Sequence, residues 1–190
     1  MSSWYLLCNI ILDNGYGNNP YVYFDQWDTP ISVLNLAALT DQLEIVEYVI
    51  DRVENKIPVI PTTPGYTILH MLAEQKGHVE TVELILSRLE KENRNPYNEQ
   101  GFSPAHLAAR NNNLELLKLF LADLEDKNPP INMLTKRTLI HLTAIGGYVH
   151  ILDYLANFVD DLNPGTYDCF SRLFLYHDFI ASGPRNIFKT

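Results

Sequence analysis

The sequence is poor in cysteine and in basic residues, and each shortage disfavours a class of protein. Only two of its 190 residues are cysteines, Cys8 and Cys169, and they lie near opposite ends of the chain. They form no C-x-x-C metal motif and no disulfide framework, so a reducing, intracellular compartment is expected. The 14 Lys and Arg residues are outnumbered by 23 Asp and Glu, which gives a net charge of −9. This balance disfavours nucleic acid, whose binding depends on cations that neutralise phosphates, and it favours a partner with a basic surface.

Long hydrophobic runs suited to a membrane are missing as well. The stretch 4–12, WYLLCNIIL, is not preceded by Lys or Arg and is interrupted by Asn9, so it does not fit a signal peptide. The weakly charged stretch 138–159 contains two histidines and Asp153, which makes it unsuitable as a membrane span. We therefore expect no membrane segment and a cytoplasmic location, with the nucleus as the alternative.

Common motifs of catalysis are also lacking. The chain has no G-x-x-x-x-G-K-[ST], G-x-G-x-x-G, G-x-S-x-G or H-E-x-x-H sequence. No residue pattern pairs a nucleophile with a base or gathers the ligands of a metal ion. The sequence predicts a protein that is not an enzyme and that has no cofactor and no metal.

Histidine recurs at a nearly constant interval along the chain. His70, His106 and His141 are separated by 36 and 35 residues, and Asn35 occupies the same place 35 residues before His70. Proline recurs with a similar spacing, at Pro20, Pro58, Pro96, Pro129 and Pro164. Two markers with one period indicate a repeat protein whose units stack on one another.

Each repeat shows the same order of local signals. Thr67, Ser103 and Thr138 are hydroxyl residues suited to cap the start of a first helix. A second helix begins with an acidic residue in its first turn, and its apolar residues follow helical spacing. The first helix is followed by residues that tolerate a left-handed backbone, namely Asp41, Gly77, Asn112 and Gly147. A helix pair of this kind buries its apolar face only by stacking on its neighbours.

The signature segments resemble ankyrin repeats. T-I-L-H (67–70), S-P-A-H (103–106) and T-L-I-H (138–141) are similar to the T-P-L-H-x-A motif of that family. The resemblance covers residues 31–160, with a period slightly above the ~33 residues of typical units. Lys76 reads as a one-residue insertion. The resemblance implies an all-α fold, an ankyrin-repeat solenoid of stacked helix-turn-helix units joined by extended loops or hairpins.

The repeats divide the chain into predicted segments. We expect a single ankyrin-repeat domain over residues 1–181 and a tail over 182–190. A chain that begins with a lone second helix is also consistent with a piece of a longer array. Within the domain we expect a half-repeat cap at 1–20, four repeats at about 30–58, 66–96, 102–129 and 137–164, and a C-terminal half-repeat cap at 165–181.

The recurring histidines could be functional, as metal ligands or general bases, or they could be structural. Equivalent side chains of adjacent repeats lie about one helix diameter, ~10 Å, apart, whereas metal–ligand bonds of ~2 Å require convergence. In ankyrin repeats the signature histidine hydrogen-bonds groups of the turn and the next repeat, and Asn35 fits such a role better than an acid–base role. The signature residues are therefore interpreted as structural: Thr67, His70, Ser103, His106, Thr138 and His141.

The resemblance also implies a binding surface. Ankyrin-like stacks bind partners through their loop tips and the exposed side of the first helices, which together form a concave strip. Aromatic anchors of the kind that dominate protein interfaces occur in this strip. Their alternative role is packing between neighbouring loops. The candidate partner-binding residues are Tyr66, Glu74, Gln75, Glu99, Gln100, Phe102, Arg110, Asn111, Leu134, Thr135, Arg137, Tyr167, Asp168 and Phe170.

The predicted function is non-catalytic protein–protein interaction of the adaptor, inhibitor or effector type, by a chain that is monomeric by itself. One alternative is a self-assembling structural repeat protein whose half-repeat ends stack between chains. A second is a hydrolase or metal enzyme that uses the histidines. Acidic residues at the ends of the second helices, such as Asp123, Glu125 and Asp160, are either solvated or form an edge for a basic partner.

Overall fold

The computed structural model describes residues 21–22, 31–53, 56–57, 59, 64–131 and 137–160. The chain divides into two compact units, Met1–Glu99 and Gln100–Thr190. The predicted single domain stays a prediction, and the predicted caps and tail lie outside the described residues.

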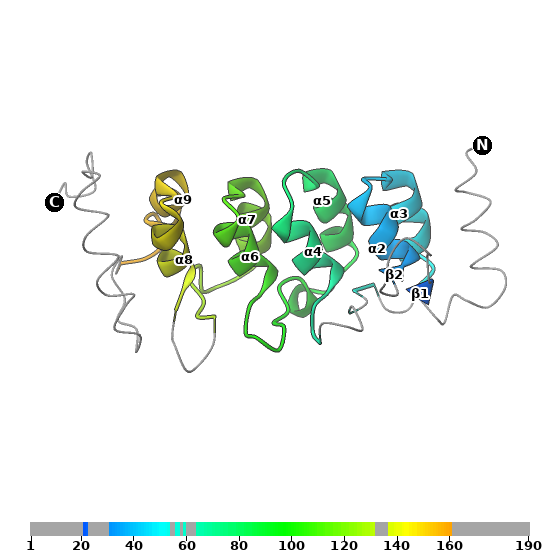
Figure 1. Cartoon of the computed structure of the whole chain (residues 1–190), viewed down its shortest axis with the longest axis horizontal. Coiled ribbons are helices and arrows are strands. Elements are labelled where there is room, and N and C mark those ends of the chain that lie inside the picture. The colour runs from blue at the N-terminus through cyan, green and yellow to red at the C-terminus, as the bar shows by residue number, and fades with distance from the viewer. Residues whose placement is uncertain are drawn as a thin grey trace. The chain divides into compact units, whose positions relative to one another are not determined.

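Unit 1, Met1–Glu99, contains two helix pairs. The first pair is α2 (Val33–Leu39) and α3 (Leu43–Ile50), and the second is α4 (Ile68–Glu74) and α5 (Val79–Ser87). Helix α2 packs on α4, and α3 packs on α5 (Figure 1). First helices therefore contact first helices and second helices contact second helices, which is the stacking that the period predicts.

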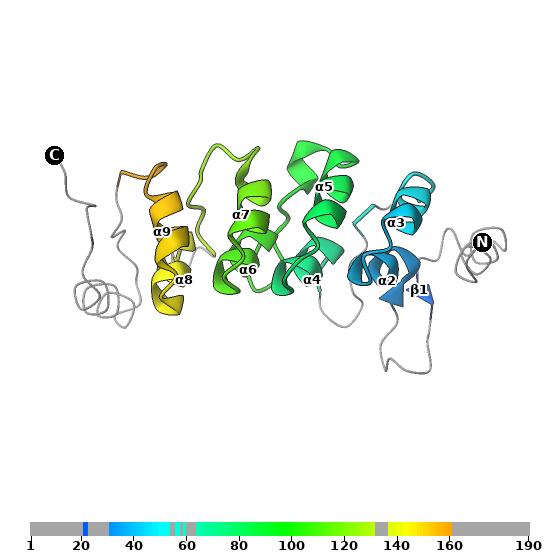
Figure 2. The same ribbon diagram turned by 90° about the horizontal axis from the view of Figure 1, so that it is seen from above.

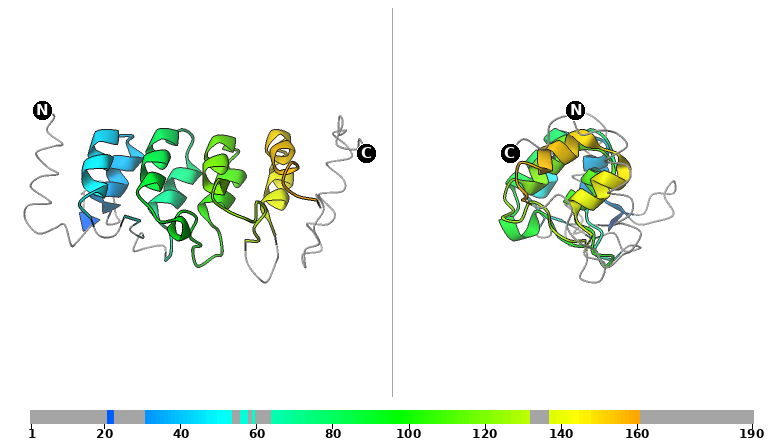
Figure 3. Two further views of the ribbon diagram at one scale, coloured as in Figure 1. Left: turned by 180° about the vertical axis from the view of Figure 1, so that it is seen from behind. Right: turned by 90° about the vertical axis from the view of Figure 1, so that its left-hand side faces the viewer.

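Unit 2, Gln100–Thr190, repeats this arrangement. Its pairs are α6 (Pro104–Arg110) with α7 (Leu114–Leu121), and α8 (Leu139–Gly146) with α9 (Val149–Leu155). Helix α6 packs on both α7 and α8, and α8 packs on α9. The two helices of each pair lie side by side from above and from behind (Figures 2 and 3).

Short antiparallel pairings precede the first helices. Strand β1 (Tyr21–Val22) pairs with β2 (Ile31–Ser32), which places Tyr21 opposite the N-cap residue Ser32. Thr67 and Thr138, the equivalent N-cap residues, form isolated bridges with Val59 and Pro130. Each of these hydroxyl residues thus ends a hairpin and starts a helix, because its backbone is extended while its side chain faces the helix.

Apolar side chains at helical spacing form the core of each unit. Small residues on the first helices, such as Ala38 and Ala108, are fully buried and allow helices of neighbouring repeats to approach closely. The buried faces of the second helices consist of Ile45, Val46, Val49 and Ile50 in α3, and of Leu116, Leu117, Phe120 and Leu121 in α7. A helix pair cannot cover its apolar face alone, so stacking on neighbouring repeats contributes to this burial.

The turns within the helix pairs adopt the left-handed backbone that the sequence predicts. Asp41, Asn112 and Gly147 have φ values of 52°, 60° and 68°, each two residues before a second helix. In the second repeat both Gly77 and His78 have positive φ. The inserted residue before them is accommodated by an extended backbone just after α4, so the second helix keeps its register.

Gly65 marks a close approach between two loops of unit 1. It lies in the turn before the N-cap of α4 with φ of 71°, and a Cβ at this position would lie 2.9 Å from the Asn98 Cα. The backbone N–H of Glu99 donates to the Pro64 carbonyl in the same region at 3.4 Å. Glycine is needed here for both the backbone conformation and the contact.

Candidate functional site

The signature residues form three hydrogen-bonded caps. In each, the backbone N–H of the N-cap residue donates to the histidine Nδ1 at 3.1 Å, and the N-cap hydroxyl lies 2.8–3.0 Å from the same atom. The three histidines are at most 1% exposed. These reciprocal contacts occur in the pairs Thr67–His70, Ser103–His106 and Thr138–His141. A buried side chain that is hydrogen-bonded to the backbone in this way stabilises the start of the helix.

Asn35 does not reproduce these contacts. The Ser32 hydroxyl accepts a hydrogen bond from the Asn35 backbone N–H at 3.0 Å, so half of the cap is kept. The amide is 0% exposed, and neither of its polar atoms has a hydrogen-bond partner among the residues that the structure describes. The hydrogen-bonding role expected from the sequence is therefore not made by this side chain within the described part of the chain.

The candidate aromatics pack on the signature histidines and keep part of their surface exposed. The Tyr66 ring stacks on His70 with centroids 5.2 Å apart, and the Phe102 ring meets His106 edge-on at 6.4 Å. The Arg110 guanidinium lies 5.3 Å from the centroid of the Phe102 ring. Both aromatics are half-buried, so packing and a role as contact residues are compatible.

The remaining candidates are distributed over both units. In unit 1, Glu74, Gln75 and Glu99 are exposed. In unit 2, Gln100 and Arg110 are exposed, whereas Asn111 and Arg137 are half-buried. Candidates that lie outside the described residues are Leu134, Thr135, Tyr167, Asp168 and Phe170.

Ile145 of unit 2 occupies an equivalent exposed position but is not among the residues predicted from the sequence. It is 53% exposed, near the end of the first helix α8. It lies four residues after His141, as Arg110 lies four residues after His106 and Glu74 four after His70. Alignment by the signature histidine identifies this position. We refer to Tyr66, Glu74, Gln75 and Glu99 as the first-helix surface of unit 1, and to Phe102, Arg110, Arg137 and Ile145 as the first-helix surface of unit 2.

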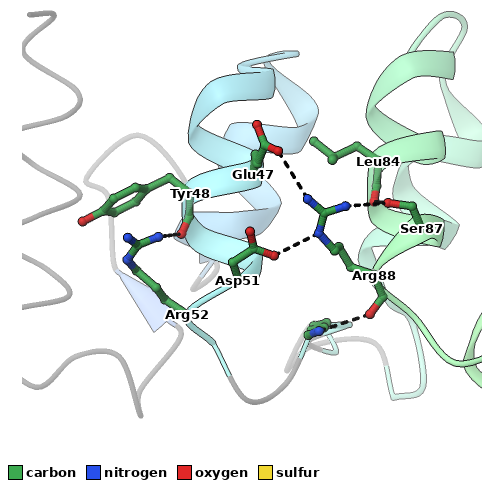
Figure 4. A network of polar contacts seen from close by, with 8 residues as sticks. Glu47, Tyr48, Asp51, Arg52, Leu84, Ser87 and Arg88 are labelled. Atoms are coloured by element: carbon green, nitrogen blue, oxygen red, sulfur yellow. Dashed lines mark hydrogen bonds and ion pairs between the residues drawn. The ribbon is translucent and has the colours of Figure 1, made fainter.

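The second helices of unit 1 are joined by an arginine. Arg88, just after α5, donates to Asp51 at 3.0 Å and to Glu47 at 3.3 Å, both on or just after α3 (Figure 4). Arg52 instead donates to the Tyr48 carbonyl of its own helix and lies over the Tyr48 ring. The Arg88 contacts link adjacent repeats on the side opposite to the pairing of first helices.

A polar cluster at the helix turns also links the two repeats of unit 1. The Thr81 hydroxyl donates to Asp41 Oδ1 at 2.8 Å, and His78 Nδ1 lies 2.7 Å from the same oxygen. The other ring nitrogen of His78 lies 3.1 Å from Gln75 Oε1. Gln75, one of the candidate binding residues, therefore also takes part in a structural contact.

The described ranges contain no group of three or more His, Cys, Asp or Glu residues that could hold a metal ion. No helix in that part of the chain is long and apolar enough to cross a membrane. Burial raises the pKa of the Tyr154 phenol above its ordinary value, because desolvation disfavours the charged form. Tyr154 lies on a second helix and belongs to neither first-helix surface.

A family model with the description Ankyrin repeats (3 copies) matches residues 34–132, more than half of the chain. The chain belongs to the ankyrin-repeat family. This confirms the predicted all-α repeat fold. The fourth ankyrin repeat predicted from the sequence begins beyond the match, and the structure places α8 and α9 there with their own Thr138–His141 cap. No curated protein matches the chain.

Membership of the family bears on function at a coarse level. Ankyrin repeats generally mediate protein–protein interaction, and domains built from them are typically non-catalytic. A fold does not determine which partner is bound. The partner of this chain therefore depends on the residues exposed on its own surface.

Proposed function

We propose that this ankyrin-repeat chain is a non-catalytic module that binds a partner protein through its first-helix surfaces and the adjacent loop tips, in the manner of an adaptor, inhibitor or effector. The observation that carries the proposal is the contrast between buried and exposed positions in each repeat. The histidine of the signature is fixed by its cap, and the residues four before and four after it reach the surface. A contact surface held in place by the fold loses little entropy on binding.

The nature of the residues at these positions supports contact with protein. Tyr66 and Phe102 offer half-exposed aromatic surface, Arg110 offers a guanidinium, and Ile145 offers aliphatic surface. Aromatic and arginine side chains contribute a large share of binding free energy at protein interfaces. The hydroxyl–histidine pairs of the caps are buried and hydrogen-bonded within the fold, so no catalytic role is proposed for them.

Location, oligomeric state and partner charge complete the proposal. The sparse cysteines support an intracellular, cytoplasmic location. We propose a monomer, which sedimentation over a range of concentrations tests. The self-assembly alternative depends on terminal segments outside the described residues. The acids at the ends of the second helices, including Asp123, Glu125 and Asp160, are exposed, so a protein that covers that side would be basic.

The test separates binding from folding. Affinity capture with the wild-type chain, followed by mass spectrometry, identifies a partner, which is then purified and titrated against variants. Phe102→Ala and Arg137→Ala are expected to weaken its binding while the melting temperature stays within a few degrees of wild type. Lys118→Ala, on the second helix α7, serves as the control with unchanged affinity. Loss of stability with unchanged affinity would assign Phe102 and Arg137 to packing and overturn the proposal.

A further inference from the structure

The first-helix surface of unit 2 alternates cationic and apolar side chains. Phe102 and Arg137 occupy one repeat position, immediately before the N-caps of α6 and α8. Arg110 and Ile145 occupy the other, four residues after the signature histidines. Because α6 packs on α8, the four positions form two adjacent rows, each with one arginine and one apolar residue.

Charge in unit 2 is segregated between the first and second helices. Neither α6 nor α8, nor the described residues just before their N-caps, contains an acidic residue, whereas Arg110 and Arg137 both lie there. The acids of the described part of this unit follow the start of the second helices instead: Glu115, Asp123, Glu125, Asp126, Asp153 and Asp160. The chain as a whole has a net charge of −9, whereas the first-helix surface of unit 2 is locally positive.

The arginines are well suited to recognise carboxylates. Arginine presents a planar set of donors that matches a carboxylate in two parallel hydrogen bonds. The Phe102 ring lies under the Arg110 guanidinium and restricts its orientation, which lowers the entropy lost when a ligand binds. Ile145, 53% exposed, offers aliphatic contact in the same row as Arg110. A ligand that fits this pattern carries carboxylates flanked by bulky apolar side chains.

We propose that the first-helix surface of unit 2 binds an acidic peptide segment of a partner protein, in which Asp or Glu residues alternate with bulky apolar residues. This inference rests on the proposed function and adds the chemistry of the partner. The two guanidinium groups come from the end of α6 and the region before α8, so one segment has to be several residues long to reach both. Charge complementarity favours such a peptide, and the acids on and after the second helices leave a nucleic acid without a continuous cationic path in the described part of unit 2.

A peptide library tests the proposal even while the partner is unidentified. Random dodecapeptides displayed on phage are selected on the full-length wild-type chain, with the Arg110→Glu/Arg137→Glu variant used to remove peptides that bind elsewhere. We expect enrichment of Asp and Glu next to Leu, Ile or Phe. The affinity of the synthesised peptides for the chain should fall at least ~10-fold with each Arg→Glu change, because each change removes about one charge-assisted hydrogen bond. Binding should also weaken as salt increases.

Controls decide among the possible outcomes. Lys118→Glu makes the same charge change on a second helix and should leave peptide affinity unchanged. Arg110→Gln provides a neutral variant should the double reversal fail to fold by circular dichroism. Selected peptides that depend on this surface but lack acids would overturn the inference and leave the proposed function intact. A selection without any surface-dependent peptide would contradict both.

Discussion

His106 Nε2 lies 3.0 Å from the carbonyl oxygen of Pro129, 23 residues later in the chain. The Ser103 backbone N–H donates to His106 Nδ1, which places the imidazole proton on Nε2 and makes Pro129 the acceptor. One side chain thus connects the start of its repeat to the loop that leads into the next. These two hydrogen bonds account for a histidine at the signature position of this repeat.

We expect His106→Ala to lower the free energy of unfolding by at least about 2 kcal/mol, because two buried backbone groups lose partners at about 1–3 kcal/mol each. Ser103→Ala should cost about 1 kcal/mol, a typical value for an N-cap. Urea denaturation of both variants measures the difference. A cost for His106→Ala below about 0.5 kcal/mol would contradict the structural role.

Asn35→His should stabilise the first repeat. The buried Asn35 amide makes no hydrogen bond in the described part of the chain, and histidine at this position forms the cap in the other three repeats. Restoring one such contact is expected to add roughly 1 kcal/mol to the free energy of unfolding. A higher midpoint of urea denaturation measures this gain. Asn35→Ala is the matched control, since it removes the amide without adding a partner. A gain equal to that of Asn35→Ala would show that the new cap contributes nothing.

Substitutions of Asp41 should separate backbone strain from hydrogen bonding. Asp41 has φ of 52° and accepts from Thr81, which is 1% exposed. Asparagine keeps an acceptor and tolerates this backbone, glycine keeps only the tolerance, and alanine keeps neither. The expected order of thermal stability is wild type and Asp41→Asn, then Asp41→Gly, then Asp41→Ala. Equal melting temperatures for Asp41→Asn and Asp41→Gly would show that the Thr81 and His78 contacts of Asp41 Oδ1 do not contribute to stability.

Arg88→Ala should destabilise unit 1 only slightly. The Glu47 and Asp51 side chains that accept from Arg88 are 59% and 46% exposed, and exposed pairs contribute about 0.2–1 kcal/mol. The effect should shrink as salt increases. Arg52→Ala is the comparison, because Arg52 bonds within its own helix. A double-mutant cycle with Glu47→Ala measures the link between repeats, and zero coupling in low salt would show that this ion pair makes no net contribution.

Tyr154 should make stability fall at alkaline pH. Its pKa is raised by burial, so the folded chain holds the phenolic proton more tightly than the unfolded chain. The corresponding stability is fully present below the unfolded pKa of about 10 and is lost as pH rises through the higher folded pKa. Tyr154→Phe should therefore show a shallower loss of unfolding free energy between pH 9 and 11. Parallel curves for the two chains would refute a raised pKa.

The local part of the structure follows directly from sequence patterns. The helix boundaries, the hydroxyl N-caps and the left-handed turns at Asp41, Asn112 and Gly147 depend on residues within a few positions of one another. The candidate surface could be located by aligning repeats on the histidines. The alignment could not reveal that the Asn35 side-chain amide has no hydrogen-bond partner among the described residues, since that depends on the atoms around it.

The sequence by itself determined the repeat, its period and the family, because a helix–turn–helix unit is encoded by short-range signals and their recurrence. Tertiary structure decided which side chains meet across repeats. Asp41 with Thr81 and Asp51 with Arg88 are 40 and 37 residues apart, and their contact depends on how neighbouring helices stack. Packing also decided that Ile145 stays exposed on the first-helix surface of unit 2, while the acids in the described part of that unit lie on or after its second helices. Burial and charge segregation are properties of a packed surface, which no single repeat forms alone.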